Sequence, residues 1–267
     1  MSTDDLHVVA VRYGTFLSDR RSAFLNHHIY GEPNGPIRLD YFFWLVRRGT
    51  DVLVIDTGFS RAVGVRRGRT MLVDPIQVLR DLGAGPETAP PIVVTHAHYD
   101  HIGNLDAFDR SRILMTRREF EFWTGDVARK RQFSHVVERS ELDELTRAHQ
   151  AGRVALIEGT HCPMPGVELL TVGGHTEGQM MVRVHTPSGT VLITSDAVHF
   201  YEELERDMPF IYMDSLSQSF RTYELIREMV AHEPNTLVLT GHDADTFSRV
   251  PTRAVPGWGE NVVIVGG

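Results

Sequence analysis

The sequence contains one cysteine, Cys162, so no disulfide bond can form within the chain. Disulfide bonds are typical of oxidising compartments, and a chain without them is compatible with a reducing one. The first residues are acidic and include no apolar signal core. No apolar run reaches the roughly 18 residues that a membrane-spanning helix needs. We therefore expect a cytoplasmic protein that has no membrane partner.

Basic residues are also scarce. Lys and Arg total 27 while Asp and Glu total 35, which gives a net charge of −8. Proteins that bind nucleic acid usually carry a basic face, so we expect no nucleic-acid partner. The sequence also lacks a Gly-x-Ser-x-Gly nucleophile turn, a phosphate-binding loop and a dinucleotide-binding fingerprint. Any catalytic chemistry must therefore come from other residues.

Histidine, in contrast, is abundant, and it is concentrated in the heptapeptide Thr-His-Ala-His-Tyr-Asp-His at residues 95–101. This heptapeptide follows an apolar run, as expected where a buried strand ends in a loop. His96 and His98 should point the same way because side chains alternate along a strand, whereas Asp100 and His101 can turn to a second point. One zinc ion takes about four ligands. The heptapeptide therefore predicts two metal ions and further ligands downstream.

Three more candidate ligands each follow an apolar strand, namely His175, Asp196 and His242. If these strand ends share one edge of the fold, five histidines and two aspartates meet there. Imidazole and carboxylate ligands without a thiolate suit zinc, and the same ligands also accept iron, cobalt or manganese. We expect two zinc ions per chain, which together could ionise a water molecule without a serine or cysteine nucleophile.

The rest of the chain alternates between strands and helices. We expect one domain over residues 1–267, with residues 117–150 as a helical insertion that serves as a lid or as a homodimer surface. We expect residues 16–35 to form a long loop, and residues 61–69 to form a solvated basic loop or an anion site. Strands are expected at 6–13, 37–46, 52–55, 154–157, 168–172, 180–184, 190–194, 236–239 and 262–265, and further helices at 74–82 and 217–231. Two β-rich halves with outer helices follow from this order.

The spaced set of ligands resembles that of the metallo-β-lactamase superfamily. The resemblance covers nearly the whole chain, and it implies an α/β (α+β) fold: a four-layer αβ/βα sandwich of two β-sheets with helices on the outer faces. It implies that one metal is held by His96, His98 and His175. It implies that Asp100, His101 and His242 hold the other metal and that Asp196 bridges the two. Asp56, at the tip of an early strand, is expected to orient the ligands from behind.

The segment Ser-Asp-Ala-Val-His-Phe-Tyr at residues 195–201 resembles the N-acyl-homoserine lactonase branch of this superfamily. That resemblance implies a metal-dependent hydrolase that opens the lactone ring of quorum-sensing signals, which is quorum quenching. A hydroxide that bridges the metals would attack the lactone carbonyl. Asp100 would accept the proton of the water and pass it to the leaving oxygen.

One position departs from the branch. The best-known lactonases have a tyrosine three positions after the bridging aspartate, and this chain has His199 there. A neutral histidine can donate one hydrogen bond, so His199 is expected to contact the substrate and contribute to catalysis, or else to be a structural residue. Tyr201 is the next candidate donor.

Other functions on the same fold remain open. They include another lactonase or carboxylesterase, a glyoxalase-II-like thioesterase and a phosphotriesterase, all with a small-molecule substrate. A penicillin-type β-lactamase is disfavoured because the full ligand set is kept without a cysteine. A di-iron redox protein usually has a glutamate in place of His98, and a non-catalytic binding protein would be expected to lose ligands.

Overall fold

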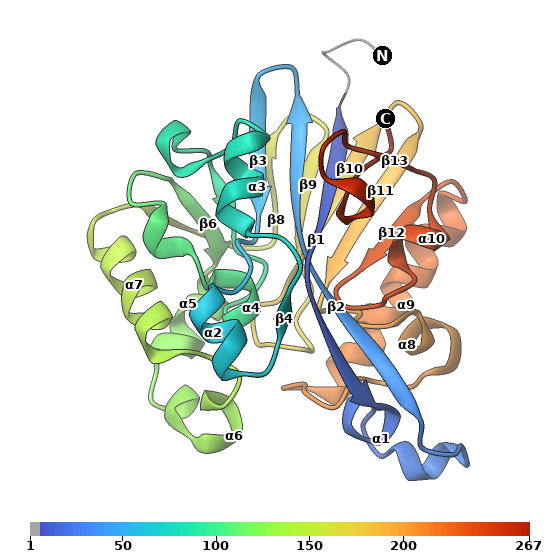
Figure 1. The fold of residues 1–267 in the computed structure, drawn as a ribbon. Helices are drawn as coiled ribbons and strands as arrows, with labels where there is room; N and C mark the ends of the chain where they lie inside the picture. Colours follow the sequence, from blue (N-terminus) through green and yellow to red (C-terminus); the bar gives the residue numbers. More distant parts are fainter. Residues whose placement is uncertain (1–5) are drawn as a thin grey trace.

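Two β-sheets pack face to face in the computed structural model, which describes residues 6–267, and helices cover both outer faces (Figure 1). The first sheet has nine strands in the order β13-β14-β1-β2-β3-β5-β6-β7, with β4 paired to β1. The second has five strands in the order β12-β11-β10-β9-β8. This four-layer arrangement confirms the predicted fold class.

The strands of the first sheet are β1 (His7–Asp19), β2 (Pro36–Arg48), β3 (Asp51–Ile55), β4 (Thr70–Met71), β5 (Ile92–Val93), β6 (Ile113–Thr116), β7 (Val154–Ile157), β13 (Thr252–Ala254) and β14 (Val262–Val265). Those of the second are β8 (Thr160–Met164), β9 (Val167–Thr171), β10 (Met180–Thr186), β11 (Gly189–Ser195) and β12 (Leu237–Thr240). The α-helices are α1 (Arg20–Ala23), α2 (Arg61–Arg66), α3 (Pro75–Asp81), α4 (Tyr99–Ile102), α5 (Arg117–Thr124), α6 (Arg131–Ser134), α7 (Arg139–Gln150), α8 (Tyr201–Arg206), α9 (Leu216–His232) and α10 (Thr246–Arg249). Short 3-10 helices are η1 (His27–Tyr30), η2 (Pro86–Thr88), η3 (Leu105–Ala107), η4 (Val127–Arg129) and η5 (Gly259–Asn261).

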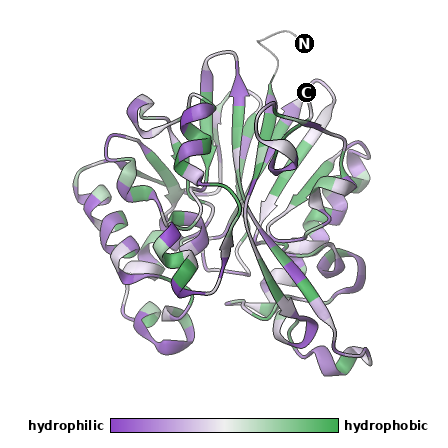
Figure 2. Ribbon diagram, in the orientation of Figure 1, coloured by the Kyte–Doolittle hydropathy of each residue, from purple (hydrophilic) through white to green (hydrophobic). Residues whose placement is uncertain are grey.

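Side chains alternate between the two faces of each strand, so each sheet packs against the other sheet on one face and against helices on the other. In β11, Ile193 faces the first sheet in the core between the sheets, whereas Leu192 packs with Tyr223 and Ile226 of α9 on the outer side. Apolar side chains on both faces of a strand are expected where both faces are covered. Figure 2 shows the same division, because the strands are largely hydrophobic while the helices carry hydrophilic residues on their outer sides.

Residues 117–150 are not an insertion in the sheet order. They contain α5, η4, α6 and α7, and they connect the parallel neighbours β6 and β7. Parallel neighbours need such a crossover, usually a helical one. Leu142 and Leu145 of α7 are buried in the core beneath the first sheet, so this part of the segment is integral to the fold.

Two loop predictions were wrong. Residues 61–66 form helix α2, whose first turn is capped by Ser60, because its side chain accepts a hydrogen bond from the backbone of Val63. Residues 16–19 continue β1, which pairs with β2 as far as Asp19 and Pro36. The expected helix at residue 74 is confirmed: the Asp74 side chain caps α3, and a proline occupies its first turn.

The strand order brings the ends of distant segments together at one edge. Parallel pairing of β11 with β12 places Ser195 opposite Thr240, just before two of the predicted ligands. The backbone of Met180 donates to the carbonyl of Thr95 at 3.0 Å and joins the second sheet to the loop after β5. No helix in residues 6–267 combines the length and apolar character that crossing a membrane requires.

Candidate metal centre

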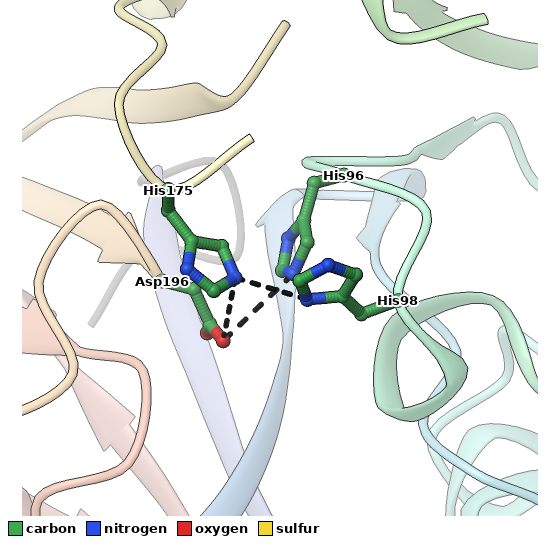
Figure 3. Close-up of side chains that lie close together, drawn as sticks. All are labelled: His96, His98, His175 and Asp196. Carbon is green, nitrogen blue, oxygen red and sulfur yellow. Dashed lines mark hydrogen bonds and ion pairs between the residues drawn. The ribbon is translucent and has the colours of Figure 1, made fainter. Parts of the chain in front are cut away.

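The structure brings all seven predicted ligands together at this edge, and each of them has a relative exposure of 7% or less. They form two sets with no residue in common, and the ligand atoms of each set lie within 4.8 Å of one another. The first set is His96, His98, His175 and Asp196, which converge in Figure 3. The second set is Asp100, His101 and His242, and a third grouping joins Asp196 and His242 to His199.

Backbone and carboxylate oxygens fix the orientation of three imidazoles. Nδ1 of His175 lies 2.8 Å from the carbonyl of Tyr212, and Nδ1 of His242 lies 2.8 Å from the carbonyl of Asp40. Nδ1 of His101 lies 2.8 Å from Oδ2 of Asp56. A carbonyl oxygen can only accept, so Nδ1 of His175 and of His242 donates, and in a neutral ring Nε2 is then the acceptor that faces the centre.

Several polar atoms at the centre have no hydrogen-bond partner although they are buried. They include Nε2 of His96, Nε2 of His101 and Oδ1 of Asp196. Nδ1 of His98 lies 3.0 Å from Nε2 of His175, so two ring nitrogens face each other. Buried polar atoms normally have partners, and cations bound in the two sets would supply the missing partners of these atoms. The residues present therefore fit a metal pair.

The protonation states agree with this fit. Burial lowers the pKa of His96 and His98 well below the usual range, and neighbouring histidines add to the shift. Burial, together with His199, lowers the pKa of His175 to about 3. These three rings are therefore neutral near neutral pH, and a neutral imidazole is the form that binds a metal.

Asp56 lies directly behind the centre, as the sequence led us to expect. Its side chain is fully buried at the end of β3. Oδ1 accepts from the backbone of Thr95 at 2.8 Å, and Oδ2 accepts from the Thr95 hydroxyl at 2.7 Å and faces His101. Asp56 therefore links the end of β3 to the start of the histidine heptapeptide and orients the His101 ring.

A second buried carboxylate, Glu119 of α5, was not expected from the sequence. Its Oε1 accepts from the backbone of Ala97 at 2.9 Å and from Nε1 of Trp123 at 2.6 Å. Its Oε2 accepts from the Thr176 hydroxyl at 2.7 Å and from the backbone of Gly178 at 2.9 Å. One side chain thus joins the loop of His96 and His98 to the loop of His175.

The local sequence did contain a signal for this residue. Thr116 caps α5, since its hydroxyl accepts from the backbone of Glu119 at 3.1 Å. A Thr-x-x-Glu pattern marks the start of a helix and predicts a glutamate in its first turn. Gly178 is required beside it, because a Cβ there would lie 2.2 Å from the Thr116 hydroxyl oxygen.

The structure brings His199 to the centre but not to the cavity beside it. Its Nε2 lies 3.3 Å from Oδ2 of Asp196, and its Nδ1 lies 3.3 Å from Oε1 of Glu203. Burial opposes a charge on His199, but these two carboxylates outweigh burial and raise its pKa to about 9. Its ring stacks on Phe210 with centroids 3.8 Å apart. Tyr201 reaches neither place, because its hydroxyl donates to the carbonyl of Val238 at 2.7 Å.

A cavity of about 630 Å³ opens above the centre. Its floor includes His98, Asp100, His175, Asp196 and His242. Its wall contains aromatic residues and two arginines, including Phe16, Tyr41, Tyr99, Phe210, Tyr212, Arg67 and Arg69. A larger hollow of about 980 Å³ near Cys162 contains none of the seven ligands, so the smaller cavity is the candidate substrate site.

The family comparison agrees with this geometry, since the family model of the metallo-beta-lactamase superfamily matches residues 37–242. The chain belongs to the metallo-beta-lactamase superfamily. Among superfamily relatives, an N-acyl homoserine lactonase of a Bacillus species is 30% identical over 171 residues, which are 64% of this chain and only 62% of the relative. An N-acyl homoserine lactonase AiiA of Bacillus thuringiensis subsp. kurstaki is 28% identical over 172 residues.

Solved structures share the fold over nearly the whole chain. A quorum-quenching N-acyl homoserine lactone lactonase superposes with a TM-score of 0.77 at 22% identity, covering 94% of this chain and 98% of its own. AidC, a dizinc quorum-quenching lactonase in complex with a product, N-hexanoyl-L-homoserine, gives a TM-score of 0.72 at 14% identity, covering 100% of this chain and 96% of its own.

Proposed function

We propose that this chain hydrolyses the lactone ring of N-acyl homoserine lactones with two zinc ions held by the seven clustered residues. The observation that carries the proposal is the cluster of seven candidate ligands, three of which have buried atoms without a hydrogen-bond partner and five of which line a cavity large enough for a small molecule. The lactonase names of the relatives over 64% of this chain support the choice of substrate.

The bound metals would supply an ionised water and would polarise the ester carbonyl. The chain itself supplies the proton path. Asp100 lines the cavity, and its Oδ2 lies 3.6 Å from Nε2 of His242 and 3.9 Å from Nε2 of His101. A carboxylate in this place could hold the metal through one oxygen, and its other oxygen could accept a proton from water and give it to the ring oxygen as that oxygen leaves.

The wall of the cavity would bind the acyl chain. Phe16, Leu39 and Phe210 line it and offer apolar surface above the polar floor. Burial of an acyl chain against this surface is favourable, and it also excludes water from the reacting ester.

The test is a panel of substrates with a metal measurement. Purified protein should contain about two zinc ions per chain by atomic emission, and it should release acid from an acyl homoserine lactone. Chelation should abolish the activity, and zinc should restore it. The other panel members are an aryl ester, a glutathione thioester and a phosphotriester. Preference for one of these, with the lactone left intact, would replace the lactonase proposal with the corresponding hydrolase.

A further inference from the structure

Arg69 is a charged residue in the cavity wall that the proposed reaction does not use. It lies between α2 and β4, in the segment for which the sequence left an anion site open, and it lines the cavity together with Asp100 and Tyr99. The side chain is half-buried. A guanidinium held partly away from water is costly unless a partner satisfies its donors.

Two contacts hold the guanidinium in place. Its carbon lies 3.8 Å from the ring centroid of Phe16, so the group packs over the aromatic face. Its Nε donates to the hydroxyl of Tyr99 at 3.1 Å. In the described part of the chain, residues 6–267, the two terminal nitrogens have no hydrogen-bond partner and Arg69 forms no ion pair. Burial lowers the pKa of Arg69, but neighbouring groups that include the Asp100 carboxylate are near enough to raise it.

The neighbouring arginine shows the contrast. Arg67 also lines the cavity, but each of its three guanidinium nitrogens has a partner: Nε donates to Glu138 at 2.8 Å, and its terminal nitrogens donate to the carbonyls of His135 and Val137 at 2.9 and 3.1 Å. The Arg67 side chain therefore connects the end of α2 to the segment before α7 through hydrogen bonds. Arg69 is oriented in the same wall and keeps a pair of donors for a ligand.

The planar edge of a guanidinium fits two oxygen acceptors that lie side by side. Two parts of the proposed ligand offer such a pair. One is the amide carbonyl with a ketone at the third carbon of the acyl chain, and the other is the carboxylate that ring opening creates. The carboxylate forms at the metal floor, whereas Arg69 packs on Phe16, one of the wall residues to which the proposed function assigns the acyl chain.

We propose that the free edge of Arg69 binds the paired carbonyls of 3-oxoacyl chains and makes the enzyme selective for 3-oxoacyl homoserine lactones. This inference rests on the proposed lactonase function. Arg69 is a specificity-determining residue on this view, since the reacting ester lies elsewhere.

The experiment compares kcat/KM for N-(3-oxohexanoyl) and N-hexanoyl homoserine lactone. Wild type should favour the 3-oxo substrate. Arg69→Met keeps the packing on Phe16 but removes the donors, and it should lower this preference by roughly 10-fold to 100-fold, the range for a lost hydrogen bond to a charged group. Arg69→Lys keeps a charge without the paired donors and should retain only part of the preference.

The matched control is Arg61→Met, which removes an exposed charge from the same segment outside the cavity and should leave the preference unchanged. Zinc content should stay near wild type in both methionine variants, and Arg69→Met should lower kcat/KM for the 3-oxo substrate more than kcat/KM for the unsubstituted one. If Arg69→Met lowers kcat/KM for both substrates by the same factor, the variant has a general packing defect and the proposal is overturned.

A second arm tests the other oxygen pair. The ring-opened product N-hexanoyl homoserine should inhibit wild type and Arg69→Met equally. Weaker inhibition of the variant with an unchanged preference would assign Arg69 to the product carboxylate and overturn the acyl-chain assignment. No change in either arm would also overturn it. Failure of wild type to open the unsubstituted lactone would instead refute the proposed function, so the two failures are distinct.

Discussion

The floor and the wall of the cavity differ in how firmly their residues are held. Each floor ligand lies just after a buried strand or in a loop pinned by a buried carboxylate, as Asp56 and Glu119 show. The wall includes side chains that remain open to solvent, such as Leu17 at 69% and Tyr212 at 41% relative exposure. A floor that is fixed by many contacts tolerates little change, whereas an open wall can vary with the ligand.

The largest effect is expected for Asp196→Ala in the floor. Asp196 belongs to two of the clustered sets, and its loss should reduce zinc below two ions per chain and lower kcat/KM for the lactone by at least about 100-fold. Zinc analysis and acid release measure the two effects. Leu17→Ala is the wall control and should change kcat/KM only slightly. Equal effects of the two variants would remove the distinction between floor and wall.

Glu119→Gln should have the next largest effect, through the ligands that the side chain positions. An amide keeps one acceptor oxygen but turns donors toward the donors of its partners, so the two ligand loops lose a shared anchor. Zinc affinity, measured by chelator competition, should fall roughly 10-fold to 100-fold.

Glu121→Gln is the matched control for that variant, because it changes an exposed glutamate of the same helix. A drop in melting temperature of the Glu119 variant with unchanged zinc affinity at 25 °C would show that Glu119 serves the fold alone and does not position the ligands.

The floor was far more predictable than the residues that hold it. His96, His98 and Asp100 stand close together after one apolar run, and strand ends in such a sheet meet at one edge, so the cluster could be inferred from local patterns. Glu119 could not be assigned in this way, because its partners at residues 97 and 178 lie far from it in the chain. Only folding brings these donors to one carboxylate.

The wall was the least predictable part, and the reason is long-range pairing. Residues 14–19 lack clear alternation in the sequence, yet they continue β1 because β2 pairs with them along their whole length. The segment around Arg69 was expected to be a solvated basic loop or an anion site. The packing of Arg69 on Phe16 depends on that same extension of β1. Because the extension was not predicted, neither Arg69 nor Phe16 could be assigned to the wall from the sequence.

Glu141 of α7 offers a comparison with Glu119, because it is buried without comparable donors. Its Oε2 has no hydrogen-bond partner, and burial, with help from Glu138, raises its pKa to about 8. The folded state therefore binds the proton more tightly than the unfolded state, whose pKa is near the ordinary value of 4.5. Stability should fall as pH rises from about 4.5 to about 8 and then stay level with respect to this group.

Glu141→Gln should remove the loss of stability that wild type shows as the pH rises. The variant should gain on the order of 2 kcal/mol in the free energy of unfolding at pH 9, relative to wild type, and almost nothing at pH 4. Denaturant unfolding at the two pH values measures the difference. Glu228→Gln on α9 is an exposed control and should show no such pH dependence. A gain of the same size at both pH values would mean that the amide acts through packing and not through the proton.

The smallest effect is expected for Tyr201→Phe. The Tyr201 hydroxyl donates to the carbonyl of Val238 in β12, away from the cavity, so the variant should lose about 1 kcal/mol of unfolding free energy. Its kcat/KM for the lactone should match wild type, although the lactonase resemblance made this hydroxyl a candidate substrate donor. A fall in kcat/KM at unchanged stability would place the hydroxyl at the substrate after all, and would require Tyr201 to leave Val238 when the ligand binds.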